Sequence, residues 1–192
     1  MRIDEIRNNW TGRFFENSFY TAYDMLDDVE NAISKFVDRK VDIFQFIKEI
    51  SEFDEYAYRL YWGASQKSNW LNTGQNKAYP IIKETIWSAV FEVIRQELVE
   101  RTGIPFVLIQ GERQKVAVAV FENGNVKYKD VDAGIGLVHD EGFTIPVIAV
   151  ECKGGHACST CHDGIWGQGM RMKAQFPNSL QAFVTDNNIT VA

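Results

Sequence analysis

The spacing of apolar residues is helical over the first third of the chain. Apolar side chains recur every three to four residues from Phe19 to Phe36 and from Asp42 to Trp62, with Asp42 as the expected N-cap. The polar segment Gly63 to Lys77 predicts a loop. A third helix is expected from about Pro80 to Arg101, because proline suits a first turn and Gly103 can end a helix.

After Gly103 the apolar period shortens to two, which is typical of strands. Asn123-Gly124 predicts a hairpin turn between two of these strands. A helix from about Asp163 to Ala174 should follow, and Pro177-Asn178 should end it before a last strand. The expected strands are Phe106–Gln110, Lys115–Phe121, Val126–Val138, Ile145–Lys153 and Gln181–Thr185.

This order predicts an α/β (α+β) fold, in which a helical N-terminal region (1–77) precedes a core (78–192) with a mixed β-sheet flanked by helices. The 192 residues, 45% of them hydrophobic, suffice for one domain with a helical extension. No stretch is apolar enough to span a membrane, and Met1-Arg2 opens no secretory signal, so we expect a cytoplasmic protein. Because the chain stops soon after a core strand, we also expect a fragment or a compact variant.

The two strands around the segment 139–144 bring charged residues together. If Val138 pairs with Ile145, antiparallel register places Asp132 opposite Glu151 and Asp130 opposite Lys153. Asp132, Glu151 and Lys153 then share one face, and Gly134 and Gly136 should leave space on it. The other face should be core, with Val131, Ala133, Ile135, Leu137, Ile148, Val150 and Cys152.

Two carboxylates beside an ammonium suit a particular chemistry. Opposed carboxylate oxygens can bind Mg²⁺, which activates a water molecule and neutralises charge on a phosphate. Lys153 could orient or deprotonate that water. The alternative is an ordinary charge cluster on a solvated face. Glu151 and Lys153, however, lie at the end of the most apolar strand of the chain. Charged side chains are costly at such a position unless they have a structural or functional role.

These residues resemble the PD-(D/E)xK nuclease superfamily. The motif of this superfamily is matched by Val131-Asp132 and, after eighteen intervening residues, by Glu151-Cys152-Lys153. Val131 stands where the motif has proline. Phe176-Pro177 and Ala182 to Asp186 resemble the later segment of its restriction endonucleases, so that roughly residues 80–190 are covered.

The resemblance implies a restriction-endonuclease-like core and an Mg²⁺-dependent endonuclease that cuts double-stranded DNA, first of all a type II restriction endonuclease. Asp132 and Glu151 would bind one or two Mg²⁺ ions, and Lys153 would be the catalytic lysine. Cutting two strands favours a homodimer, with the N-terminal helices in dimerisation or DNA contact. No ATP-binding motif is present, so no nucleotide cofactor is expected. The net charge of −6 argues against a nucleic-acid binder, although an acidic chain can carry a local basic surface.

Further site residues are less sharply indicated. Members of the superfamily often add a glutamate from the preceding helix, and Glu84 is the candidate, against the alternative of a first-turn acid favoured by the helix dipole. Glu92 and Glu97 are weaker choices. Gln168 and Arg171 share a helix face and are candidate DNA contacts, unless they are simply an exposed polar face.

Two histidines and two cysteines follow the third strand of the meander. His156, Cys158, Cys161 and His162 offer zinc ligands, although four within seven residues are cramped for one tetrahedron. Cys158 to His162 also has the spacing of a haem attachment motif, and a glycine-rich loop with reduced thiols is the remaining alternative. The rival functions are therefore a repair or defence nuclease and a non-catalytic zinc-binding interaction module.

Overall fold

The computed structural model describes residues 22–51, 78–153, 159–185 and 189–191. The chain divides into two compact units, Met1–Ala89 and Val90–Ala192, and the divide falls inside helix α4 (Ala78–Thr102). No helix within the described ranges is long and apolar enough to cross a membrane.

The first unit contains α2 (Ala22–Val37) and a helix that is described over residues 43–51. Its described core includes Val29, Ile33 and two stacked rings, Phe36 and Phe46, whose centroids are 4.2 Å apart. Asp42 Oδ1 accepts a hydrogen bond of 2.8 Å from the backbone N–H of Gln45, which confirms the predicted N-cap. The two predicted helices are confirmed over these ranges, while residues 19–21, 52–62 and the predicted loop 63–77 lie outside the described residues.

Helix α4 confirms the third predicted helix and begins two residues earlier than expected. Gly103 ends it with a φ of 70°, and the Gly103 N–H donates a hydrogen bond of 2.8 Å to the Val99 carbonyl. This left-handed position favours glycine, as the sequence predicted.

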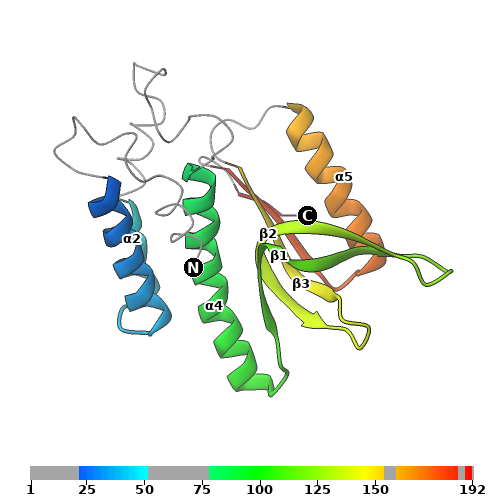
Figure 1. Cartoon of the computed structure of the whole chain (residues 1–192), viewed down its shortest axis with the longest axis horizontal. Helices are drawn as coiled ribbons and strands as arrows, with labels where there is room; N and C mark the ends of the chain where they lie inside the picture. The colour runs from blue at the N-terminus through cyan, green and yellow to red at the C-terminus, as the bar shows by residue number, and fades with distance from the viewer. Residues whose placement is uncertain (1–21, 52–77, 154–158, 186–188, 192) are drawn as a thin grey trace. The chain divides into compact units, whose positions relative to one another are not determined.

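The second unit is built on a five-stranded mixed sheet in the part of the chain described, which confirms the mixed α/β class (Figure 1). The strands lie in chain order, with β1–β2, β2–β3 and β4–β5 antiparallel and β3–β4 parallel. Helix α5 (Ser159–Gln175) connects the parallel pair and packs on β1 and β4. The strands are β1 (Val107–Val120), β2 (Val126–Val138), β3 (Thr144–Lys153), β4 (Leu180–Thr185) and β5 (Ile189–Val191).

Three elements differ from the prediction. The two strands expected at 106–110 and 115–121 are one long strand, β1, whose pairing with β2 shifts register around Gly111. Beyond this irregularity Val116 pairs with Lys129 on β2 and also, in parallel, with Thr144 on β3. Helix α5 begins four residues before Asp163, and β5 was not predicted.

The turns of the meander follow the sequence signals. The Phe121 N–H donates to the Asn125 carbonyl at 2.8 Å, and Gly124 adopts a φ of 80° in the turn predicted by Asn123-Gly124. At the next turn the His139 N–H donates to the Phe143 carbonyl at 2.8 Å. Both hairpins therefore close with short turns, and this limits how far the strands can slide.

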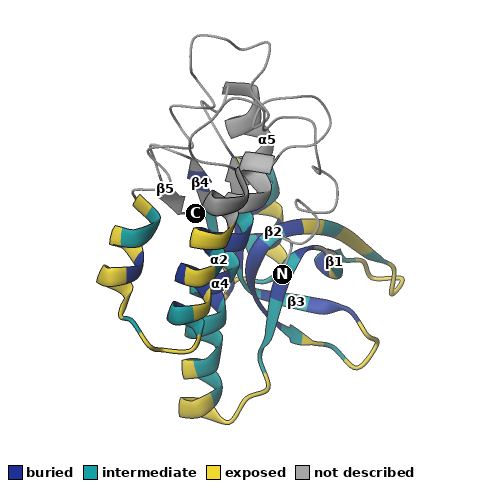
Figure 2. Cartoon of the chain, turned by 60° about the vertical axis from the view of Figure 1, so that its left-hand side comes forward, coloured by how far each residue is buried: buried dark blue, intermediate teal, exposed yellow. Residues whose placement is uncertain are grey.

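The core of the second unit covers both faces of β2. Every residue from Val131 to Gly136 except Asp132 is buried, odd and even positions alike (Figure 2). Val131, Ala133, Ile135 and Val150 confirm the predicted core face. Met172 of α5 and residues of β1, β2 and β3 form one buried hydrophobic cluster. Its strand members are Ile109, Val116, Val131 and Ala149.

The β2–β3 register agrees with the prediction where the charged residues lie and departs from it at the turn. Ala133 pairs with Val150, and Ile135 with Ile148, as expected. Val138, however, pairs with Thr144 and not with Ile145, so the predicted register is wrong by one residue at that end. The ladder shifts between Ile135 and Gly136, where Val147 is the extra residue of β3.

Gly134 and Gly136 do not leave space on the sheet, which corrects the prediction. A Cβ on Gly134 would lie 2.1 Å from the backbone oxygen of Ile148. A Cβ on Gly136 would lie 2.3 Å from Thr144 Cγ2 and 2.8 Å from the Ile145 oxygen. The glycines therefore allow the backbone of β3 to approach β2 more closely than any side chain would permit.

We predict that Gly134→Ala costs about 3 kcal/mol of unfolding free energy, because a backbone oxygen cannot rotate away from the new methyl group. Gly167→Ala in α5 is the matched control, since its Cβ would meet only Arg171 Nη1 at 3.8 Å. This control should be neutral or stabilising by about 0.5–1 kcal/mol. Urea unfolding of the three proteins measures both effects, and a Gly134→Ala protein as stable as the wild type would contradict the close approach.

Candidate active site

Asp132 and Glu151 lie at the end of the β2–β3 ladder. Each is one residue beyond the last paired positions, Ala133 and Val150. If this register continued, Asp132 and Glu151 would lie opposite each other. On the β1 side, Asp132 is the extra residue of β2 between the pairs Gln110–Ala133 and Gly111–Val131. Asp132 is half-buried, and the side chain of Glu151 is only 16% exposed. The structure thus places the two predicted carboxylates on neighbouring strands at one edge of the core.

Glu151 forms an ion pair that the sequence did not predict. The Lys129 ammonium donates a hydrogen bond to Glu151 Oε1, and the Lys129 side chain is 28% exposed. Strict alternation along β2 would place Lys129 on the face of Val131, away from Glu151. The register shifts between β1 and β2 near Lys129 interrupt the regular ladder there, and nothing in the sequence marks them.

Lys153 is the last residue of β3, two positions after Glu151. Its backbone pairs with Thr185 of β4, as that of Glu151 pairs with Phe183. The strand position is therefore as predicted, while the Lys153 side chain lies outside the described part of the structure. Asp130, its expected cross-strand neighbour, is exposed.

Glu84, the candidate third carboxylate, lies on α4 in the first unit and is half-buried. The first turn of α4 holds no acidic residue, so the helix-dipole explanation for Glu84 is wrong. Its membership of the site stays a prediction. Among the described side chains, no group of three His, Cys, Asp or Glu residues is arranged to bind a metal ion.

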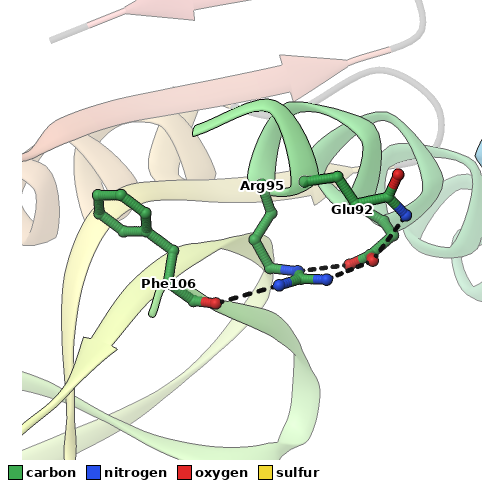
Figure 3. A network of polar contacts seen from close by, with 4 residues as sticks. Glu92, Arg95 and Phe106 are labelled. Atoms are coloured by element: carbon green, nitrogen blue, oxygen red, sulfur yellow. Dashed lines mark hydrogen bonds and ion pairs between the residues drawn. The ribbon is translucent and has the colours of Figure 1, made fainter. Parts of the chain in front are cut away.

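Glu92, a weaker candidate ligand, belongs to a polar network instead (Figure 3). Arg95 donates to both carboxylate oxygens of Glu92, at 2.7 and 2.6 Å, and Gln96 donates to one of them at 3.0 Å. Arg95 Nη1 also donates to the Phe106 carbonyl at 3.3 Å, which ties α4 to the segment before β1. The hydrogen bonds from Arg95 lower the pKa of Glu92 despite its partial burial, and those with Glu92 raise the pKa of Arg95.

Two candidate DNA contacts lie on α5 and differ in exposure. Arg171 is exposed, as a phosphate contact requires. Gln168 is half-buried, and its Oε1 is a buried oxygen without a hydrogen-bond partner in the structure as described. The alternative of a simply exposed polar face is therefore wrong for Gln168.

The cysteine–histidine segment is only partly described. Because α5 begins at Ser159, Cys161 and His162 belong to the first turn of a helix and not to a loop. His156 and Cys158 lie outside the described residues, as do the side chains of the other two. The zinc site and the haem motif stay untested expectations.

Comparisons with protein-family models, with curated proteins and with solved structures find no match to this chain.

We predict that Glu92→Gln lowers the unfolding free energy at pH 7 by about 1 kcal/mol, because Arg95 would lose its charged partner. The pKa of Glu92 is lowered on folding, so this contribution is present above the ordinary glutamate value of 4.5. It should disappear as the pH falls through the lowered value. Urea unfolding at a series of pH values would then show the wild-type and variant curves converging in acid.

Glu97→Gln on the same helix is the control. Glu97 pairs with Arg101, but the two side chains are 51% and 74% exposed. An exposed pair of this kind contributes about 0.5 kcal/mol or less. The structural role of the Glu92–Arg95 pair would be contradicted if the two variants lost equal unfolding free energy. It would also be contradicted if the loss in Glu92→Gln did not change with pH.

Proposed function

We propose that this protein is an Mg²⁺-dependent endonuclease that hydrolyses phosphodiester bonds of double-stranded DNA, and specifically a type II restriction endonuclease. The observation that carries the proposal is the position of Asp132 and Glu151, which flank the end of the same β2–β3 ladder. Glu151 is followed two residues later by Lys153 at the end of β3. These strand positions support the proposal, which rests on the resemblance to the PD-(D/E)xK superfamily.

The carboxylates suit a hard divalent cation. Asp132 and Glu151 offer oxygen ligands, and Mg²⁺ is commonly bound by one or two carboxylates together with water and phosphate oxygens. Glu151 already contacts a cation, the Lys129 ammonium, in the structure. A carboxylate with only 16% of its side chain exposed needs such a partner, because burying an unpaired charge is costly.

Each residue of the site has a distinct role in this proposal. Asp132 and Glu151 bind the metal from two strands, and the close packing around Gly134 and Ala149 fixes the spacing of those strands. Bound Mg²⁺ would supply charge neutralisation at the phosphate and a lower pKa for the attacking water. Lys153 orients or deprotonates that water and balances the negative charge that grows in the transition state.

The architecture of the second unit supports a restriction-endonuclease-like core. An antiparallel meander, β1 to β3, leads into a strand–helix–strand crossover, β3–α5–β4, in the order the sequence predicts. The residues that follow Asp132 on β2 are buried on both faces, so Asp132 sits on a rigid strand. A rigid support of this kind is what a catalytic metal site requires.

DNA and a second copy of the chain are the proposed partners. Arg171 is an exposed cation on α5 and is positioned to contact phosphate, and Gln168 lies one turn before it. Cleavage of both strands of a duplex favours a homodimer. We assign dimerisation or DNA contact to the N-terminal helices, consistent with the two-unit organisation of the chain.

We predict that the purified protein converts plasmid DNA into discrete fragments with Mg²⁺ and leaves it intact with EDTA. Asp132→Asn and Lys153→Met should each lower the cleavage rate by at least about 100-fold, because each removes a metal ligand or a proton-transfer group. Asp140→Asn is the matched control, since Asp140 is an exposed carboxylate in the β2–β3 turn, and it should cut at the wild-type rate.

The pattern of products separates the rival functions. A smear of fragments would favour a nonspecific repair or defence nuclease that uses the same site. Full activity in folded Asp132→Asn or Lys153→Met protein would refute the assignment of these residues. Absence of any cleavage by the wild type over a wide range of DNA sequences would favour the non-catalytic binding module.

A further inference from the structure

Lys129 is the cation that contacts Glu151, and the proposed reaction gives it no role. It lies on β2, three residues before Asp132, and its ammonium donates to Glu151 Oε1 on β3. Both side chains are mostly buried, with 28% and 16% exposed. Such a pair is less screened by water than the exposed pairs elsewhere in the chain, for example Lys40–Asp38.

The ion pair and a divalent cation need the same carboxylate. A metal bound by Asp132 and Glu151 would take Glu151 oxygens as ligands, and the Lys129 ammonium already occupies one of these oxygens. Two cations close together at one carboxylate repel each other. We therefore expect binding of a metal to open or lengthen the Lys129–Glu151 contact.

Lys129 can leave Glu151 without disturbing the strand that carries Asp132. The lysine side chain can move alone, because the Lys129 backbone stays paired with Val116 of β1. The lysine side chain is long and flexible and ends in a single point charge. Arg95, by contrast, donates hydrogen bonds to both oxygens of Glu92 and a further one to the Phe106 carbonyl.

We propose that Lys129 is an internal counter-cation, which neutralises Glu151 in the metal-free protein and is displaced when a divalent cation binds. The inference rests on the metal site of the proposed function. Lys129 keeps the buried carboxylate paired at all times, either with the ammonium or with the metal. It consequently stabilises the metal-free fold and weakens metal binding by competition.

The test is calorimetric titration of the full chain with Ca²⁺, which binds oxygen ligands without needing turnover. We predict that Lys129→Met binds Ca²⁺ about tenfold more tightly than the wild type, because the competing charged hydrogen bond is gone. Lys127→Met is the matched control, since Lys127 is an exposed lysine two residues away on β2. It should stay within about twofold of the wild type, because an exposed charge acts only weakly.

Thermal unfolding gives a second readout that does not depend on catalysis. Without metal, Lys129→Met should melt about 3 °C below the wild type, since the ion pair with Glu151 is lost. Saturating Ca²⁺ should close this gap. If Lys129→Met does not fold, Lys129→Gln keeps a hydrogen-bond donor without the charge and carries the same prediction for Ca²⁺ affinity.

The outcomes separate this inference from the proposed function. Equal or weaker Ca²⁺ affinity in Lys129→Met, with binding abolished by Glu151→Gln, would overturn the counter-cation role and leave the metal site intact. Absence of Ca²⁺ and Mg²⁺ binding in both the wild type and Lys129→Met would overturn both. Tighter binding in Lys127→Met to the same extent would show a general effect of charge and would also overturn the role of Lys129.

Discussion

The close approach of the β3 backbone to Gly134 is the constraint on which the position of the carboxylates depends. A side chain at Gly134 would overlap the Ile148 oxygen, so only glycine allows the two strands to pack in this register. The bulge at Val147 absorbs the one-residue mismatch that begins at the turn. Without it, the far end of β3 would present its opposite face, and Glu151 would point away from Asp132.

The burial of Glu151 means that its carboxylate needs a charged partner. Because the Glu151 side chain is only 16% exposed, its charge has little contact with water and needs a cation close by. Lys129 supplies this cation in the structure. The Glu92–Arg95 pair shows another way to meet the same need: Arg95 donates to both oxygens of Glu92 on the same helix and also to the Phe106 carbonyl before β1. A single ammonium contact is easier to exchange, which suits the metal site proposed for this position.

Much of this arrangement could be predicted from the sequence because it follows from local patterns. The Asp42 cap, the Gly103 helix end and the Asn123-Gly124 turn are confirmed, each resting on the conformational preference of one or two residues. The pairing of Ala133 with Val150 was predicted from an assumed Val138–Ile145 pair; that pair is wrong, and the bulge at Val147 restores the predicted register further along the strands. β5 was missed because Ile189-Thr190-Val191 is too short for a periodic signal.

The rest depends on contacts between strands, which no local pattern reports. Gly134 and Gly136 were expected to leave space, yet they allow a close approach, and the sequence of β2 alone does not distinguish the two. The Lys129–Glu151 ion pair was not predicted, because the register shifts between β1 and β2 leave no local signal in the sequence. The contact with Glu151 depends on how β1, β2 and β3 pack together.

An experimental structure of the protein with Mn²⁺ would test the central claim, that Asp132 and Glu151 form a metal site, most directly. Anomalous scattering identifies the ion without reference to any activity. The account predicts one peak about 2.1 Å from a carboxylate oxygen of each residue, with the Lys129 ammonium moved away from Glu151. A structure in which Lys129 still holds Glu151, and in which Mn²⁺ binds elsewhere or not at all, would contradict it.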